Sequence, residues 1–209
     1  MIADEGTTLG TEAARRLAEL TELNEGAWVI EPGLTPAEFD RVEHEFGFQF
    51  AADHRAFLAA GLPVSVPHDD PPGVFSTWRE PWPDWRDADP VKLREQLDHP
   101  AQGVLFDVEN NRLWHDTWGP RPEAMPEALA IAREALTQVP VLVPVYGHRF
   151  LPAGQGTFGH PVLSVWQTDI ICYGLDIADY IGQEFGGRGL HFDDQAEPRV
   201  TVPFWRDFV

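Results

Sequence analysis

The chain contains almost no cysteine, which excludes two kinds of cross-linked architecture. Cys172 is the only cysteine among 209 residues, so no disulfide can form within the chain. A structural zinc site built on paired thiolates is excluded for the same reason. Stability must therefore come from an ordinary packed core, and hydrophobic residues, at 43% of the sequence, are numerous enough to build one.

Positive charge is also scarce. The chain has 15 Lys and Arg residues against 34 Asp and Glu residues, a net charge of −19, and Lys92 is its only lysine. This excess repels phosphate backbones and anionic bilayers, so neither nucleic acid nor a membrane is expected as a partner. A basic protein would instead be attracted and steered. The alternative interpretation is that the acidity only keeps the protein soluble.

Long hydrophobic runs are missing, as is the pattern of a secretory signal. No stretch is long and apolar enough to span a membrane, and the first twenty residues lack a basic segment followed by an apolar one. We therefore expect a cytoplasmic protein. A length of 209 residues fits one domain, expected at 11–209 after a loose leader at 1–10.

The order of the apolar patterns predicts an α+β fold, because helices and strands do not alternate regularly. The expected helices are 11–23, 36–46, 52–60, 90–98, 122–137 and 175–185. The expected strands are 103–107, 113–118, 139–146, 148–152, 162–166 and 169–173, the last two forming a hairpin about Gln167 and Thr168. The clearest signal is a capping box, in which Thr35 begins a helix and Glu38 stands three residues later.

Residues 63–90 form an insertion rich in proline and tryptophan. Proline at this density prevents regular ladders of hydrogen bonds between strands. Tryptophans, by contrast, are costly to leave in water. We expect an ordered, irregular loop packed on the domain, and the sequence does not show whether it is ordered without a partner.

Three segments carry a resemblance to a known family. They are GLTPAEFDRVEHEFGFQFAADHRAFLAAG at 33–61, GVLFDVENNRLWHDTWGPRP at 103–122, and VPVYGHRFLPAG with GHPVLSVWQTDIICYGLDIADYIGQEFG at 143–186. Together they resemble the SUKH superfamily, of the Smi/Knr type and its bacterial branch. The family has a helix, an apolar link with Leu-Pro and an Asp-Tyr-x-x-Phe-Leu helix. Here the link lacks its proline and His54 replaces the tyrosine.

The resemblance implies a fold and a class of function. The fold is a mixed, largely antiparallel sheet flanked by helices. The family includes fungal cell-wall-synthesis regulators and bacterial immunity proteins that bind toxins, and it implies no reaction. We therefore expect a non-enzymatic protein with no cofactor and no metal.

Tryptophans alternate with carboxylates in two stretches of the chain. In an interface, aromatic rings anchor a partner and carboxylates select a basic one. The candidate partner-binding residues are Trp78, Trp82, Asp84, Trp85, Asp87, Asp107, Glu109, Trp114, Asp116 and Trp118. The alternative is that the rings fill the core beneath the proline-rich loop.

A candidate pocket is expected around Tyr146, His148, Arg149 and Asp169. Arg149 lies between apolar segments, so it is expected to pair with a carboxylate such as Asp107 or Asp169. Whether this pairing is structural or lines a pocket is left open by the sequence.

The residue types of metal and nucleophilic chemistry do not form a recognisable motif. Eight histidines are scattered, and none belongs to an HExxH arrangement. Cys172 lies in the apolar run 170–173, which favours a buried thiol over a nucleophile.

The leading hypothesis is an immunity-type protein that binds a cognate toxin with a basic surface, such as a nuclease. One alternative is a regulatory or scaffold domain like those of the fungal branch. The other is a small-molecule-binding or hydrolytic enzyme that uses His148, Arg149 and Asp169 in a cleft. The sequence does not reveal the partner or the oligomeric state.

Overall fold

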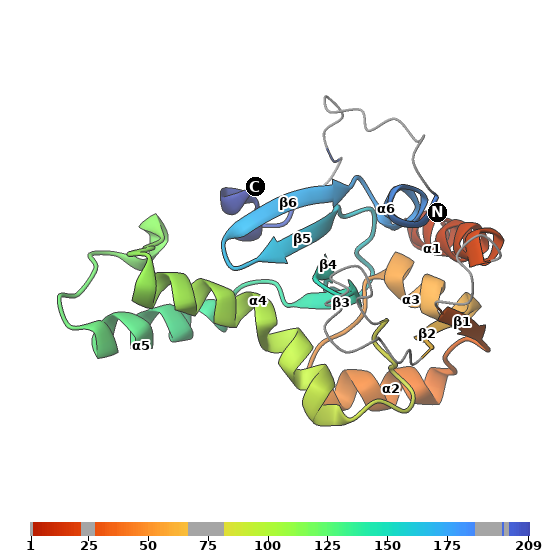
Figure 1. Cartoon of the computed structure of the whole chain (residues 1–209), viewed down its shortest axis with the longest axis horizontal. Coiled ribbons are helices and arrows are strands. Elements are labelled where there is room, and N and C mark those ends of the chain that lie inside the picture. Colours follow the sequence, from red (N-terminus) through yellow and green to blue (C-terminus); the bar gives the residue numbers. More distant parts are fainter. Residues whose placement is uncertain (1, 22–27, 67–81, 187–197, 199–200) are drawn as a thin grey trace, which may run out of the picture.

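A computed structural model of the chain describes residues 2–21, 28–66, 82–186, 198 and 201–209. Within them the chain forms six α-helices, two short 3-10 helices and two sheets (Figure 1), which confirms the predicted α+β class. In chain order the elements are α1 (Ile2–Thr21), β1 (Trp28–Glu31), α2 (Pro36–Phe46), α3 (Ala52–Ala60), β2 (Leu62–Ser65), α4 (Pro90–Asn110), η1 (Asp116–Trp118), α5 (Met125–Leu136), β3 (Leu142–Tyr146), β4 (Arg149–Pro152), β5 (Val162–Trp166), β6 (Asp169–Gly174), α6 (Ile177–Phe185) and η2 (Trp205–Phe208). Among the helices described, none combines the length and apolar character that crossing a bilayer requires.

The strands form two sheets, which corrects the prediction of one mixed sheet. β1 pairs with β2, with Trp28 opposite Ser65, and β3, β4, β5 and β6 follow one another as a four-stranded meander. All strand pairs within the described residues are antiparallel. The physical reason is the short connections of β3–β4 and β5–β6, because a tight turn can join only antiparallel neighbours. The predicted hairpin about Gln167 and Thr168 is confirmed.

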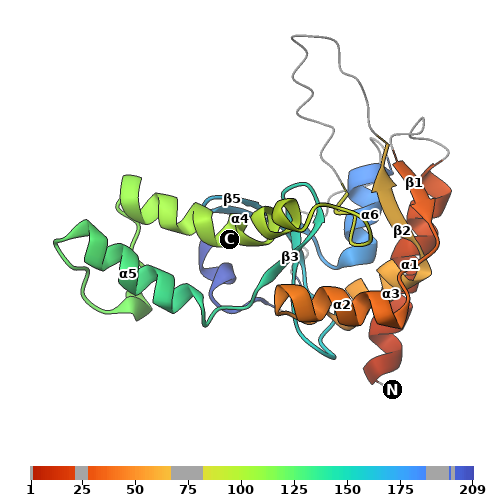
Figure 2. The same ribbon diagram turned by 90° about the horizontal axis from the view of Figure 1, so that it is seen from below.

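Both faces of the four-stranded sheet are apolar, and helices cover each. Successive residues of a strand point to opposite faces. Leu151 accordingly joins the core shared with α1, α3 and α6, while Phe150 joins the core shared with α4 and the C-terminal segment. The two views show α1, α3 and α6 gathered at one end of the molecule, whereas α5 and the C-terminal half of α4 project as an antiparallel pair at the other (Figures 1 and 2).

Helix α4 is the largest departure from the predicted elements. It continues beyond the predicted 90–98 through the buried Pro100 to Asn110, so the expected strand at 103–107 is helical. The expected strand at 113–118 is a loop ending in η1. Gly103 explains part of the error: a Cβ at this position would lie 2.7 Å from Cα of Gln167, so glycine lets the β5–β6 turn pack against the helix.

Helix α1 replaces the expected loose leader. It begins at Ile2, whereas the prediction placed residues 1–10 outside any element. Gly10 lies directly against α3, because a Cβ there would approach the carbonyl oxygen of Asp53 to 2.0 Å. Arg16 donates a hydrogen bond of 2.7 Å to the carbonyl of Ala178 in α6. Helix α1 is therefore tied to two other helices.

The predicted capping box at the start of α2 is confirmed. The backbone N–H of Glu38 donates to Oγ1 of Thr35, and the N–H of Thr35 donates back to Glu38 at 2.7 Å. The guanidinium of Arg86 also donates to the Glu38 carboxylate at 2.6 Å. These bonds, that of Arg86 above all, lower the pKa of Glu38 to about 2.

The lowered pKa of Glu38 predicts a pH-dependent stability. A carboxylate stabilised by folding contributes above its ordinary pKa, near 4.5, and the contribution is lost as the pH falls toward about 2. We expect Glu38→Gln to lower the free energy of unfolding at pH 7, and the deficit to shrink through this window. Urea unfolding of both proteins across the pH range measures it. Glu45→Gln, an exposed position on the same helix, is the control, and a deficit independent of pH would contradict the prediction.

Candidate interaction surface

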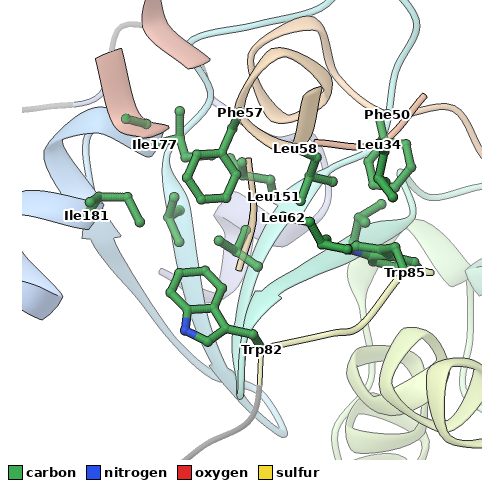
Figure 3. Packing of buried hydrophobic residues seen from close by; sticks show 14 of the residues in the cluster. Leu34, Phe50, Phe57, Leu58, Leu62, Trp82, Trp85, Leu151, Ile177 and Ile181 are labelled. Carbon is green, nitrogen blue, oxygen red and sulfur yellow. The ribbon is translucent and has the colours of Figure 1, made fainter. Parts of the chain in front are cut away.

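Trp82 and Trp85 lie in the core and are not available to a partner. Their exposed fractions are 3% and 1%, respectively. Trp82 packs against Phe57 and Phe185, and Figure 3 shows it beneath Phe57 in the core. The partner-binding role predicted for these two rings is therefore wrong, and the alternative, rings filling the core, is correct for them. Trp78 lies outside the described residues.

Asp84 and Asp87, the two acidic candidates next to Trp82 and Trp85 in the sequence, have different roles. Asp84 is half-buried, and one of its oxygens accepts the backbone N–H groups of Arg86 and Asp87, both at 3.0 Å. It thus closes a turn, as aspartate commonly does. Asp87 is exposed and can meet a partner.

Asp107 is also structural. It is buried, and its carboxylate accepts a hydrogen bond from Asn111 and two from Thr168, through the backbone N–H and Oγ1. These bonds tie α4 to the β5–β6 turn beside the Gly103 contact. The predicted partner-binding role of Asp107 is therefore wrong, because its carboxylate faces inward and is occupied.

The remaining candidates lie at the far end of α4. Trp114 and Trp118 are half-buried and pack edge to face at 5.2 Å, whereas Glu109 and Asp116 are exposed. Helix α4 has 21 residues and is about 30 Å long at the usual rise per residue. The predicted set is therefore split between two regions near opposite ends of this helix. It does not form one surface.

His115 has the hydrogen-bond partners of a catalytic histidine, but a structural role accounts for them. Nδ1 lies 2.7 Å from Oγ1 of Thr117, and Nε2 lies 3.2 Å from the Asp207 carboxylate. A hydroxyl, a histidine and a carboxylate in this order are the components of nucleophilic catalysis. Here, however, Nδ1 also accepts the N–H of Thr117 as the cap of η1, and Asp207 belongs to η2. The histidine therefore joins two short helices.

The predicted pocket is not one cleft. Arg149 forms an ion pair with Glu184 of α6 at 3.3 Å, which corrects the predicted pairing with Asp107 or Asp169. It also donates to Ser164 at 3.0 Å and stacks on Tyr173. Tyr146 packs on the same side, against Trp82 and Phe185. His148 instead lines a hollow against α4, and Asp169 is exposed at the tip of the β5–β6 hairpin.

Of the predicted pocket residues, all of them in the described part of the chain, only His148 lines the hollow against α4, and the other residues of that hollow were not predicted. It has a volume of about 490 Å³ and lies between α4 and the tips of the two hairpins. Its lining residues are Lys92, Glu95, Gln96, His99, Gly147, His148, Phe150 and Trp166. We call it the α4 hollow. Trp166 is its most notable member, because 62% of this large ring is exposed.

Aromatic rings surround the α4 hollow. His99 stacks parallel to Phe150 at 6.3 Å, and its ring lies 6.1 Å from that of Trp166. His148 meets Trp166 edge to face at 6.3 Å. Alternation along the predicted strand 162–166 could not have found this site, because Val162 and Ser164, which have the same parity as Trp166, are buried.

Cysteine and metal chemistry receive no support from the geometry. Burial raises the pKa of the Cys172 thiol, which holds the less reactive protonated form. Within the described ranges, no three His, Cys, Asp or Glu side chains gather closely enough to hold a metal ion.

The distribution of charge is the most general feature of the surface. Many arginines of the described residues bind carbonyls, rings or carboxylates of the protein itself: Arg15, Arg16, Arg41, Arg55, Arg86, Arg94, Arg121, Arg149 and Arg206. Many carboxylates are exposed: Asp40, Glu45, Asp87, Asp89, Glu95, Asp98, Glu109, Asp116, Glu123, Glu127, Glu134 and Asp169. These arginines thus have partners within the protein, although Arg15, Arg41, Arg94 and Arg206 are themselves exposed, and exposed carboxylates outnumber exposed basic side chains among the described residues.

The segment with the fullest resemblance to the SUKH superfamily folds as helix, link and helix. Asp53, His54, Phe57 and Leu58 of α3 are all buried. Burial lowers the pKa of His54 to about 3, so this residue is a neutral ring packed on Phe50 where the family has tyrosine. No protein-family model, curated protein or solved structure matches the chain. The family assignment therefore stays a prediction.

Proposed function

We propose that the protein is a non-enzymatic immunity protein of the SUKH type, which neutralises a toxin with a basic surface by binding it. The observation that carries the proposal is the acidic exterior. A net charge of −19 is combined with many exposed carboxylates along the described chain. Such a surface favours encounter with a basic protein.

The arrangement of the core supports a binding function over catalysis. His148, Arg149 and Asp169, which the enzymatic alternative requires in one cleft, point to different surroundings. Arg149 is held by Glu184 and Ser164, and a residue so occupied is poorly placed to bind a substrate. The exposed carboxylates need no such cleft, because they act by steering and by excluding the toxin's substrate.

The experiment couples rescue to the salt dependence of binding. A candidate toxin encoded beside this protein is expressed with and without it, and the purified pair is studied by stopped-flow mixing. We expect co-expression to restore growth. We also expect the association rate constant to fall by about tenfold or more between low and physiological salt, because screening removes electrostatic steering.

Three outcomes would count against the proposal. Growth that co-expression does not restore would exclude immunity to that toxin. Rescue with an association rate independent of salt would keep immunity but remove the electrostatic mechanism. Stoichiometric binding of several unrelated proteins, none toxic, would favour the regulatory alternative.

A further inference from the structure

We propose that the α4 hollow receives an arginine side chain of the basic partner. The inference rests on the proposed function for the origin of that arginine, but the hollow and its chemistry do not depend on it. Trp166 stands at the hollow with most of its ring exposed, and three other rings lie around it. Such an exposed ring is unusual in a chain whose Trp82, Trp85 and Trp205 are buried.

The indole ring of Trp166 favours a cation as the occupant. The face of an indole attracts a guanidinium or ammonium group, and tryptophan is the strongest of the aromatic side chains in this interaction. A guanidinium is planar and weakly hydrated, so it can stack on a single open ring. The hollow lies open between α4 and the two hairpins, which suits stacking on Trp166.

One carboxylate lines the hollow, and a second, which is not part of its lining, is paired with Trp166 in the β5–β6 hairpin. Glu95 lines the hollow from α4. Asp169 lies directly opposite Trp166 in the β5–β6 register, and residues so paired project from the same face of a sheet. Both carboxylates are exposed, and a guanidinium can bind carboxylate oxygens while its plane rests on a ring.

Replacing Lys92 distinguishes the arginine proposal from its strongest alternative, an anion-binding site. The ammonium of Lys92 lines the hollow with His99 and His148, and these groups together could attract an anion. The net charge and the two carboxylates oppose an anion, so we favour the cation. In that case Lys92 competes with the incoming arginine for Glu95. Replacing Lys92 with methionine should then strengthen binding, whereas in an anion site it should weaken it.

The test uses small probes and no toxin. The ¹⁵N-labelled protein is titrated with N-acetyl-arginine methylamide, with the neutral citrulline analogue, and with inorganic phosphate. The indole N–H signal of Trp166, identified by its loss in Trp166→Ala, is followed by NMR. We expect saturable, millimolar binding of the arginine probe, at least about fivefold tighter than citrulline. Binding should be about two- to threefold tighter in Lys92→Met and weaker in the Glu95→Gln/Asp169→Asn variant, as expected for exposed charge pairs.

Three outcomes of these titrations would overturn the inference. They are equal affinity for arginine and citrulline, no shift at Trp166, and a phosphate response that Lys92→Met abolishes. The matched control is Phe106→Ala, which removes an exposed ring that belongs to α4 and does not line the hollow. This variant should bind the arginine probe as the wild type does. Failure to find a toxin would leave these results intact. A toxin bound equally by Trp166→Ala and wild type would overturn the inference while leaving immunity in place.

Discussion

Replacing Trp82 with alanine is expected to lower the free energy of unfolding by about 4 kcal/mol, as for other buried tryptophans. The ring is 3% exposed and contacts Trp28, Phe57, Tyr146 and Phe185. These residues come from β1, α3, β3 and α6, so the cavity would loosen four elements at once. Urea unfolding followed by circular dichroism measures the loss.

Two further variants make the Trp82 test specific. Trp82→Phe keeps a ring in place and removes an indole N–H that finds no acceptor within the described part of the chain, so it should cost much less than alanine. Trp166→Ala removes the same side chain from an exposed site and should change stability by no more than about 0.5 kcal/mol. Equal losses for Trp82→Ala and Trp166→Ala would show that Trp82 is not part of the core.

Arg149→Met is expected to cost about 3 kcal/mol, because it removes one partner of a largely buried ion pair. The side chains of Arg149 and Glu184 are only 11% and 20% exposed. The variant removes the positive charge that lies 3.3 Å from the Glu184 carboxylate, beside the fully buried Tyr180. It also removes the donor to Ser164 and the cation stacked on Tyr173.

A double variant tests the mechanism of this loss. If the cost arises from leaving one buried charge without the other, Arg149→Met/Glu184→Met should recover more than half of it, since an apolar pair of similar volume can replace a buried ion pair. Thermal unfolding of the single and double variants measures the coupling. Additive losses would instead show that the two side chains act independently and that the ion pair contributes little.

Local signals along the chain predicted the local structure well. Thr35 and Glu38 define the start of α2, and Gly61 follows the end of α3 at the predicted residue. The hairpin about Gln167 and Thr168 was also found, because alternating apolar residues flank a short polar turn. In each case the determinants lie within a few residues of one another, where spacing alone can be read.

Elements that depend on distant contacts were missed. The apolar run at 103–107 was interpreted as a strand, but Gly103 and Asp107 serve contacts with Gln167 and Thr168, some sixty residues away in the sequence. The strands β1 and β2 are short and pair across α2 and α3. Their pairing is a product of helix packing, which periodicity does not reveal.

The same distinction between local signals and distant contacts applies to the candidate site residues. Composition correctly indicated an unusual set of rings and carboxylates, but it could not distinguish the buried Trp82 from the exposed Trp166. Asp107 and the exposed Glu109 are two residues apart, yet one is enclosed by hydrogen bonds and the other faces solvent. Burial is a property of the assembled fold. The sign of the total charge, by contrast, required only counting.

The position of Lys92 allows one site on the molecule to be labelled selectively. As the only lysine, it is the only side chain that common amine-directed reagents modify, and it lines the α4 hollow together with Trp166. A dye attached there would report occupancy of the α4 hollow directly. Immobilisation through this lysine would instead turn that face toward the support and block it, so sensor measurements of partner binding require attachment elsewhere.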